Sequence, residues 1–338
     1  MTPEPLAVRA DPPSVLDVPP AHLELTWRPL QHGDIDALHG LLAVVEEADA
    51  TPARTSREEL VETFAEPWRD LQRDSLGGFD QDGALRAYGL VTVRPGDERT
   101  VRAFLRGSVD PAWRGRGIGR AVLAWMEGRG RQMLAESGKD LPGRLAVYVD
   151  EEARDHRRLY AAAGFSPIRW YTQMRRDLSV PPPDVVVEGV RVEPWRPDLD
   201  EAVRLAHNDA FADHWGSEPR SAQDWERHGA HFAPGWSFVA LDEGGAVVGY
   251  TMSGRYELDW PVVGFTFGYT DLVGVRPAWR GRGVAVVLLA RAMAAFRDDG
   301  MAYAVLGVDT ANPTGAHGLY ERLGYEPFHG EVLYSVEI

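Results

Sequence analysis

Two stretches rich in arginine and glycine carry the residue types that hold phosphate groups. The heptapeptide Pro-Ala-Trp-Arg-Gly-Arg-Gly occupies residues 111–117 and again residues 277–283. Each copy follows a run typical of a β-strand and precedes a run with helical spacing. Closely spaced glycines let several backbone N–H groups point at one spot, and the N-terminus of a helix adds positive potential there. The two stretches therefore predict two sites for a phosphate-bearing ligand.

The spacing separates this motif from other phosphate-binding loops. A P-loop ends in Gly-Lys-Ser or Gly-Lys-Thr, which neither copy has. A dinucleotide fingerprint needs Gly-x-Gly-x-x-Gly, and the small residues here are spaced differently. Both copies fit the pattern Arg-x-x-Gly-x-Gly/Ala instead. The residues that we expect to bind phosphate are Arg114, Gly115, Arg116, Gly117 and Gly119 in the first copy and Arg280, Gly281, Arg282, Gly283, Val284 and Ala285 in the second.

The surrounding sequence repeats in the same order, which predicts two domains. Trp-Arg-Pro at residues 27–29 returns at 195–197, and Leu-Tyr-x-x-x-Gly-Phe/Tyr at 159–165 returns at 319–325. A proline run at residues 181–183 resists both helix and central strand and marks the connection. We expect a Pro-rich N-terminal tail over 1–22, an N-terminal domain over 23–178, a linker over 179–188 and a C-terminal domain over 189–338.

Each copy has the pattern of an α/β domain. Strand-like runs alternate with amphipathic helices, and turns rich in Asp and Gly at residues 80–83 and 242–245 predict hairpins. The helix after the second Arg/Gly motif has apolar residues at spacings of three and four. In the first copy, Gly128 and Gly130 predict that the matching helix ends early.

At these motifs the chain resembles the GNAT superfamily of N-acetyltransferases, in a tandem two-domain form. In that superfamily the turn Arg-x-x-Gly-x-Gly/Ala cradles the pyrophosphate of acetyl-CoA, and Leu-Tyr-x-x-x-Gly-Phe/Tyr is a later signature. The resemblance covers nearly the whole chain after residue 23. It implies two GNAT-like domains, each with a mixed, mostly antiparallel central sheet flanked by helices, and acetyl-CoA as the co-substrate.

The resemblance also implies roles for two residues of the second copy. Asn312 stands where the superfamily has an asparagine that contacts the CoA arm, although its distance to the following tyrosine is one residue longer than usual. Tyr320 stands where a tyrosine can protonate the departing thiolate. The first copy has Glu152 in place of the asparagine, and a carboxylate adds negative charge beside a polyanionic ligand. We therefore expect the first copy to bind pyrophosphate and to be degenerate in catalysis; the competing interpretation is a fully active second site.

N-acyl transfer requires a neutral amine beside a polarised thioester carbonyl. In the superfamily a bulge in the strand before the motif aims a backbone N–H at that carbonyl, and Val273 and Val275 occupy that strand end here. A base must also accept the amine proton. Asp271 lies four residues before Val275, on the same side by strand alternation, so we expect it to be the base; an ordinary exposed acid is equally compatible with its position. Three weaker alternatives are Tyr269, Glu257 and Asp259.

The composition limits the kind of ligand and the cellular setting. The chain of 338 residues has 36 Lys and Arg, 51 Asp and Glu and no Cys, which gives a formal net charge of −15 and removes thiolate metal sites and cysteine nucleophiles. This acidity argues against nucleic-acid binding, and it either attracts a cationic substrate or only keeps the protein soluble. The N-terminus does not have the pattern of a secretory signal, and no window approaches the length of an apolar membrane span. We expect a cytoplasmic protein without a membrane, nucleic-acid or metal partner.

Together these features predict an acetyl-CoA-dependent N-acetyltransferase in which a primary amine attacks directly, mainly in the C-terminal domain. The acceptor is a small-molecule or peptide amine. Residues 208–216 are rich in aromatic and acidic side chains and are a candidate for receiving it, although packing explains the aromatic residues equally well. The alternative, from a different functional class, is a sensor that binds acyl-CoA in both copies without transfer. The sequence does not indicate an oligomeric state.

Overall fold

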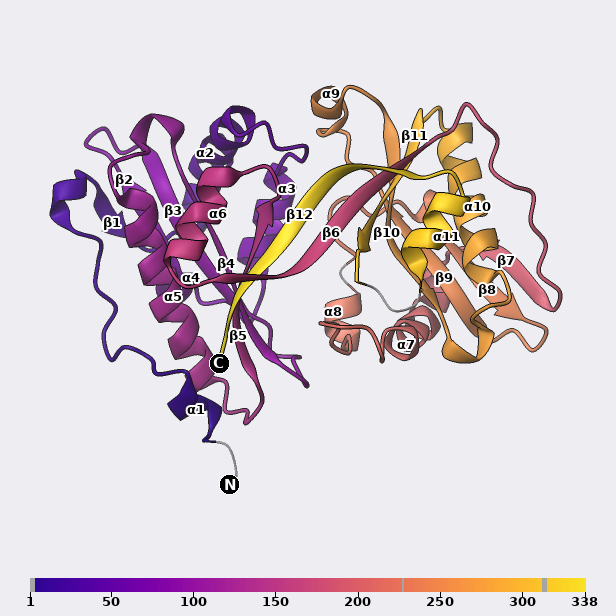
Figure 1. Ribbon diagram of the computed structural model, residues 1–338, viewed down its shortest axis with the longest axis horizontal. Helices are drawn as coiled ribbons and strands as arrows, with labels where there is room; N and C mark the ends of the chain where they lie inside the picture. The colour runs from indigo at the N-terminus through magenta and orange to yellow at the C-terminus, as the bar shows by residue number, and fades with distance from the viewer. Residues whose placement is uncertain (1–3, 227, 312–314) are drawn as a thin grey trace. The chain divides into compact units, whose positions relative to one another are not determined.

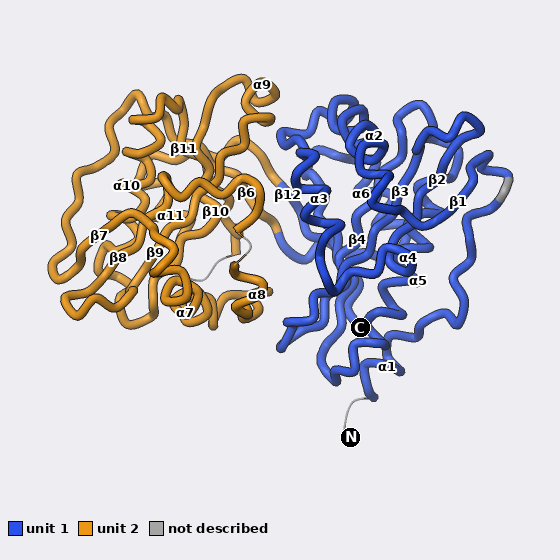
Figure 2. Tube along the Cα trace, turned by 180° about the vertical axis from the view of Figure 1, so that it is seen from behind, with its two compact units in different colours: residues 1–169, 331–338 blue, residues 170–330 orange. Residues whose placement is uncertain are grey.

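The chain forms two compact units (Figures 1 and 2). The computed structural model describes residues 4–226, 228–311 and 315–338. Unit 1 consists of Met1–Arg169 and Glu331–Ile338, and unit 2 consists of Trp170–Gly330. Each unit contains a β-sheet flanked by helices, so the predicted α/β class is confirmed.

Unit 1 is built on a mixed sheet with the strand order β1, β2, β3, β4, β5, β12. The pair β4 and β5 is parallel, and the other neighbouring pairs are antiparallel. The strands are β1 (Thr26–Arg28), β2 (Ser75–Phe79), β3 (Leu85–Val93), β4 (Val101–Val109), β5 (Gly143–Asp150) and β12 (Glu326–Glu337). The helices are α1 (Leu6–Arg9), α2 (Ile35–Ala48), α3 (Arg57–Ala65), α4 (Leu71–Asp74), α5 (Ile118–Glu136) and α6 (Arg154–Ala162).

Strand alternation gives this sheet two buried faces. Ala87 and Val91 of β3 pack in the cluster that contains α5, whereas Tyr88 and Leu90 pack with α2 and α3. The buried residues of α2 recur three or four positions apart, which turns one face of the helix to the sheet. We call the side of the sheet covered by α2 and α3 the α2 face.

Helix α5 continues through the two glycines at which an early end was expected. A Cβ at Gly128 would lie 2.8 Å from a Leu16 side-chain atom, and a Cβ at Gly130 would lie 2.7 Å from one of Leu145. The expectation was wrong because these glycines allow close packing against the helix, and that packing outweighs their low helix propensity.

The N-terminal segment is docked on unit 1. Leu6 of α1 is fully buried, and Gly143 leaves room for it, since a Cβ there would lie 2.6 Å from Leu6. The guanidinium of Arg9 donates to the carbonyl oxygens of Leu141, at 2.7 Å, and Ile338, at 2.5 Å. The two ends of the described chain are thereby tied to the same region of unit 1.

Unit 2 has a mixed sheet with the strand order β6, β11, β10, β9, β8, β7, in which only β10 and β11 are parallel among the pairs described. The strands are β6 (Ser166–Asp177), β7 (Val190–Pro194), β8 (Phe238–Asp242), β9 (Val247–Gly254), β10 (Phe267–Val275) and β11 (Tyr303–Asp309). The helices are α7 (Asp200–Ala210), α8 (Ala222–Trp225), α9 (Trp260–Val263), α10 (Val284–Asp298) and α11 (Ala316–Arg322). The predicted hairpin turns are present in both units, with the N–H of Gly83 donating to Asp80 and that of Gly245 to Asp242, each at 3.0 Å.

The last strand of each sheet comes from the other sequence repeat. Strand β6 ends the first repeat, yet it pairs with β11 of unit 2, with Met174 opposite Leu306. Strand β12 ends the second repeat, yet it pairs with β5 of unit 1, with Tyr334 opposite Val147. The compact units therefore divide the chain differently from the repeats at these two strands.

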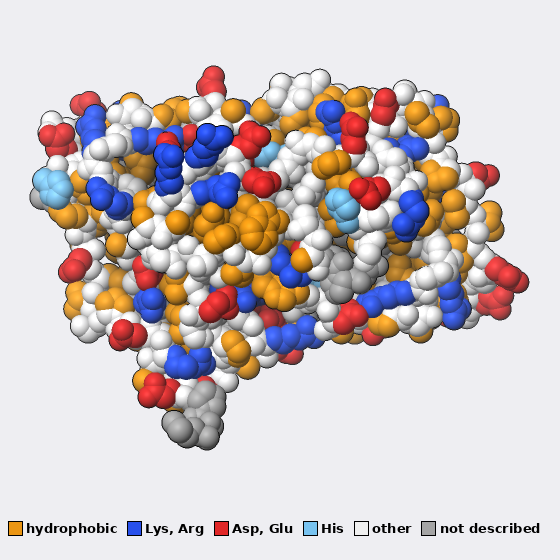
Figure 3. Space-filling model, viewed as in Figure 1, with side chains coloured by type: hydrophobic (Ala, Val, Ile, Leu, Met, Phe, Trp, Pro, Cys, Tyr) orange, Lys and Arg blue, Asp and Glu red, His pale blue; other side chains and the backbone are white. Residues whose placement is uncertain are grey.

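Charged side chains of both signs lie on the surface. On the face seen in Figure 3, basic and acidic side chains are interspersed with apolar ones. Across the part of the chain that the structure describes, none of the helices is long and apolar enough to cross a membrane.

Candidate active site

Both Arg/Gly motifs form a turn whose backbone donors are free. In unit 2 a 3₁₀ turn (Pro277–Trp279) leads to Gly281 and Gly283, with φ of 74° and 85°, and α10 begins at the next residue. Positive φ values favour glycine, so the turn depends on the two glycines of the motif. The backbone N–H groups from Gly281 to Val286 have no acceptor among the described residues. Such a row of donors at a helix N-terminus binds anions.

The unit 1 turn has the same form. A 3₁₀ turn (Pro111–Trp113) leads to Gly115 and Gly117, with φ of 77° and 90°, and then to α5. Gly119 lies in the first turn of α5, as Ala285 does in α10. The geometry of the turn therefore does not distinguish the two units.

The first arginine of each motif is an anchor for the turn. Arg280 donates to both carboxylate oxygens of Asp213, at 2.6 and 3.0 Å, and to the carbonyl oxygen of Ala210 at 2.8 Å. This pairing raises the pKa of Arg280 and lowers that of Asp213. Arg114 makes the matching pair with Asp49 at 2.5 and 2.8 Å. These arginines fix the turn against the end of α2 in unit 1 and of α7 in unit 2, and their charge is already balanced.

The second arginine of each motif lies over a tryptophan ring. Arg282 is 4.9 Å from the ring centre of Trp279, and it forms no hydrogen bond or ion pair within the described residues. Arg116 is 4.5 Å from the ring centre of Trp113 and 3.8 Å from a carboxylate oxygen of Glu24. Arg282 is therefore the motif arginine in unit 2 that is available to a phosphate.

A gap between parallel strands lies beside each turn. Pairing of β10 with β11 ends at Thr270 opposite Leu306, although β10 continues to Val275. The N–H of Arg276 donates to Val248 of β9 at 2.9 Å. Because N–H directions alternate along a strand, those of Val273 and Val275 point to the side where the partner strand has diverged. They are placed to contact an acyl-CoA in the gap.

Strand β10 carries a bulge at Asp271. Thr270 is paired with Ser253 and Leu272 with Met252, so Asp271 is the extra residue. The hydroxyl of Tyr256 donates to its carboxylate at 2.7 Å. A Cβ at Gly254 would lie 2.7 Å from the other carboxylate oxygen, so this glycine makes room for the acid.

The environment of Asp271 favours a proton acceptor near neutral pH. The residue is exposed at the surface, but protein atoms crowd the carboxylate, and this loss of hydration raises its pKa to about 6. The Tyr256 hydrogen bond and the nearby His231 both act in the opposite direction. The rings of His231 and Tyr256 are 4.7 Å apart, and those of Tyr256 and Tyr269 are 5.6 Å apart. The carboxylate thus lies in an aromatic cluster.

The other sequence-based candidates for the base are placed less favourably. The carboxylate of Glu257 accepts a hydrogen bond from Arg255 at 2.6 Å. Asp259 is buried at the start of α9. Tyr269 lies close to Asp271, and its hydroxyl would be 3.0 Å from a Cβ at Gly307. No sequence pattern marks Tyr256 and His231, because the role of each depends on a contact between distant segments.

Tyr320 of α11 is a buried tyrosine with a free hydroxyl. Its side chain packs against Tyr325, with ring centres 5.9 Å apart, and burial raises its pKa to about 12. The hydroxyl has no hydrogen-bond partner among the described residues and stays protonated at neutral pH. Tyr160 in unit 1 is equally buried, with its pKa also raised to about 12. Asn312 lies outside the described residues.

Unit 1 lacks the bulge and its acid. The register of β3 with β4 is continuous from Ala87 opposite Val109 to Val93 opposite Ala103. By strand register, Phe104 of unit 1 takes the position of Tyr269 in unit 2, and Tyr148 takes the position of Gly307. The rings of Phe104 and Tyr148 are stacked, with centres 6.1 Å apart. An aromatic pair therefore replaces the open acidic cluster. Glu152 is exposed, and its N–H donates to Asp150 at 2.8 Å.

The acids of residues 208–216 are engaged by arginines. Asp209 pairs with Arg276 at 3.0 Å, and Asp213 pairs with the motif arginine. Asn208 bonds the backbone of Arg220 in both directions. The segment therefore holds the glycine turn of unit 2 in place, and Asp209 and Asp213 are not free to receive a cationic amine. Within the residues the structure describes, no group of three or more metal-ligating side chains is found.

The twin sheets, each with a gap between parallel strands and a glycine turn rich in free N–H groups, define a CoA-dependent acyltransferase. The model of the Acetyltransferase (GNAT) family matches residues 42–165 and 200–325, and the chain belongs to this family. It is an N-acetyltransferase of the tandem type, with an acyl-CoA as co-substrate.

Relatives of similar length support this assignment. A mycothiol acetyltransferase from Nocardia farcinica is 30% identical over 89% of this chain and 93% of its own, and one from Thermobispora bispora is 33% identical over 79% and 89%. A GCN5-related N-acetyltransferase from Sphaerobacter thermophilus is 26% identical, with a TM-score of 0.70 over 93% of this chain and 96% of that chain. A tandem GNAT protein from the clavulanic acid biosynthesis pathway shares the fold, with 20% identity and a TM-score of 0.68 over 93% and 98%.

Proposed function

We propose that unit 2 moves an acetyl group from acetyl-CoA to a primary amine of a small molecule. The turn at residues 281–286 holds the pyrophosphate, assisted by Arg282. The N–H groups of Val273 and Val275 hold the acyl arm and polarise the thioester carbonyl. The neutral amine attacks the carbonyl carbon directly, without a covalent enzyme intermediate.

Two side chains handle the protons in this scheme. Asp271 accepts the proton that the amine loses, directly or through a water molecule. When the carbon–sulfur bond breaks, Tyr320 gives its proton to the CoA thiolate. Amide and free CoA are then the products, and a proton passes back to Tyr320 from solvent.

The bulge at Asp271 is the observation that carries the assignment to unit 2. Both units have the glycine turn, the strand gap and the buried tyrosine, so these features do not separate them. Only β10 has an additional acidic residue beside the gap, whereas β4 runs without a register shift. We infer that unit 1 binds acyl-CoA through its turn, formed by residues 114–119, and is degenerate in catalysis.

The names of the relatives suggest which acceptor amine to test first. They are mycothiol acetyltransferases, so the non-acetylated form of mycothiol is the first amine to test. The excess of acidic over basic residues, 51 against 36, favours an acceptor that arrives as a cation.

The test measures release of CoA thiol from acetyl-CoA in the presence of that amine and of simpler primary amines. Asp271→Asn should lower kcat by about 10²–10⁴-fold, the usual contribution of a general base. The matched control is Glu331→Gln in unit 1, where burial and Asp150 raise the pKa of the acid to about 7.

The control also tests the competing assignments. A loss confined to Glu331→Gln would move catalysis to unit 1, and equal losses would mean that both units work. Acetyl-CoA binding without turnover of any amine would favour the sensor alternative.

A further inference from the structure

Three arginines on the α2 face of unit 1 form no close ion pair with a carboxylate in the described parts of the chain. Arg69 donates to the carbonyl oxygen of Thr63 at 2.8 Å and to the hydroxyl of Thr92 at 2.9 Å, and both acceptors are neutral. Arg94 and Arg106 form no hydrogen bond or ion pair with any residue in the described parts of the chain. By contrast, many arginines of the chain pair with a carboxylate.

The strand register gathers these arginines in one place. Leu90 of β3 packs with α2 and α3, and Arg106 of β4 lies directly opposite it. Thr92 lies two residues further along β3, on the same face, and holds the guanidinium of Arg69. Arg94 follows the end of β3 in the same alternation.

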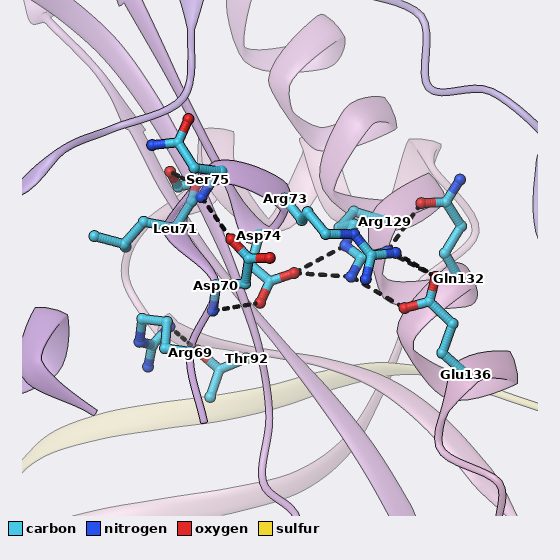
Figure 4. A network of polar contacts seen from close by, with 11 residues as sticks. Arg69, Asp70, Leu71, Arg73, Asp74, Ser75, Thr92, Arg129, Gln132 and Glu136 are labelled. Atoms are coloured by element: carbon cyan, nitrogen blue, oxygen red, sulfur yellow. Dashed lines mark hydrogen bonds and ion pairs between the residues drawn. The ribbon is translucent and has the colours of Figure 1, made fainter. Parts of the chain in front are cut away.

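Asp74, one of the two acids that attract Arg69, is already engaged by another arginine (Figure 4). Asp74 accepts a hydrogen bond from Arg129 at 2.9 Å, and Arg129 also bonds Glu136 at 3.2 Å. Arg129 and Asp74 are both buried and balance each other. In Figure 4 Arg69 reaches Thr92 and lies apart from the pair of Asp74 and Arg129.

The electrostatics of Arg69 reflect this imbalance. Burial, followed by repulsion from Arg106 and Arg94, lowers its pKa to about 10, although Glu66 and Asp74 partly offset the effect. Glu331 attracts Arg106, but burial raises the pKa of this acid to about 7, so it carries only part of its charge at neutral pH. A half-buried cation without a counter-charge is unfavourable, and a bound anion would supply that charge.

We propose that the α2 face of unit 1 is a binding site for a small organic oxyanion, held by Arg69, Arg94 and Arg106. Guanidinium groups bind carboxylate and phosphate through paired, charge-assisted hydrogen bonds. Phe104 lies opposite Thr92 on the same face and stacks with Tyr148, which offers an apolar surface for the rest of the ligand. The site lies level with the middle of β4, at Phe104 and Arg106, whereas the glycine turn follows Val109 at the C-terminal end of that strand.

The experiment uses the full chain with saturating CoA, so that both glycine turns are occupied. Malonate and inorganic phosphate are titrated as probes in calorimetry and thermal-shift assays, with sodium chloride at matched ionic strength as reference. We expect saturable binding of at least one probe. Replacing Arg69 and Arg106 by Gln should weaken it about tenfold or more, since charge-assisted hydrogen bonds from guanidinium groups are among the strong ones.

The control is Arg158→Gln, which removes an arginine with an 80% exposed side chain from α6 of the same unit and should leave binding unchanged. A response to malonate alone identifies a carboxylate ligand, and a response to phosphate alone identifies a phosphate. No response beyond that to sodium chloride, or equal binding by the double variant, would overturn the proposal. If the double variant does not fold, the exposed Arg94→Gln is compared instead, with CoA binding as the check of folding.

Discussion

The hydroxyl of Tyr256 should set the pH range in which Asp271 works. Tyr256→Phe removes the 2.7 Å hydrogen bond to the carboxylate and leaves the ring beside His231. That bond stabilises the ionised carboxylate, so its loss must raise the pKa of Asp271 above its present value of about 6. Hydrogen bonds to charged groups contribute about 1.5–3 kcal/mol, and 1.36 kcal/mol corresponds to one pKa unit. Because water reaches Asp271, we expect the lower end, a rise of about one unit.

The assay is kcat/KM for thiol release between pH 5 and pH 9, corrected for the separately measured protonation of the amine. An acid of pKa about 6 is half ionised at pH 6, and one of pKa about 7 is about a tenth ionised there. The variant should therefore be about fivefold slower at pH 6 and nearly equal to the parent above pH 8.5. Tyr303→Phe, a change on the neighbouring strand, should leave the profile unchanged. The fall of kcat/KM at low pH should move to higher pH in Tyr256→Phe. If it stays in place or moves to lower pH, the assignment of Asp271 as the base is refuted.

Three further predictions concern the leaving group, the turn and the core. Tyr320→Phe should lower kcat by about 10²–10⁴-fold at saturating acetyl-CoA, whereas Tyr160→Phe should cost little; equal losses would contradict unequal units. Acetyl-CoA should raise the melting temperature, and Arg282→Glu should reduce that rise in a thermal-shift assay, because binding only to the folded state stabilises it; an unaltered rise would remove this arginine from the site. Gly268→Ala should lower the free energy of unfolding by about 1–3 kcal/mol in urea titration, because its Cβ would lie 2.3 Å from a buried ring of α10. Gly235→Ala, which meets nothing within 4 Å, should cost less.

The glycine turns could be predicted because their chemistry is local. The positive φ values at Gly281 and Gly283 and the free donors that follow are consequences of a short motif. The side chain of Arg280 could not be placed in this way, because its partner Asp213 lies 67 residues away. The structure places an ion pair between Arg280 and Asp213 at that position.

The bulge changes the correspondence between the two sequence copies by one residue, and this change is located only with the structure. Before the bulge, Thr270 matches Leu105, and after it Leu272 matches Arg106, so the offset between the copies changes by one residue. Pairing with β9 decides that Asp271 is the extra residue. The partners of β6 and β12 were not predictable either, since an amphipathic strand has no local mark of the sheet that it will join.

The exchanged closing strands also bear on why both repeats persist. Deleting the first repeat would remove β6 and leave β11 without its neighbour, and deleting the second would remove β12 from β5. Neither gene half encodes a complete sheet. Even if unit 1 is degenerate in catalysis, as proposed, its repeat is still needed to complete the sheet of unit 2.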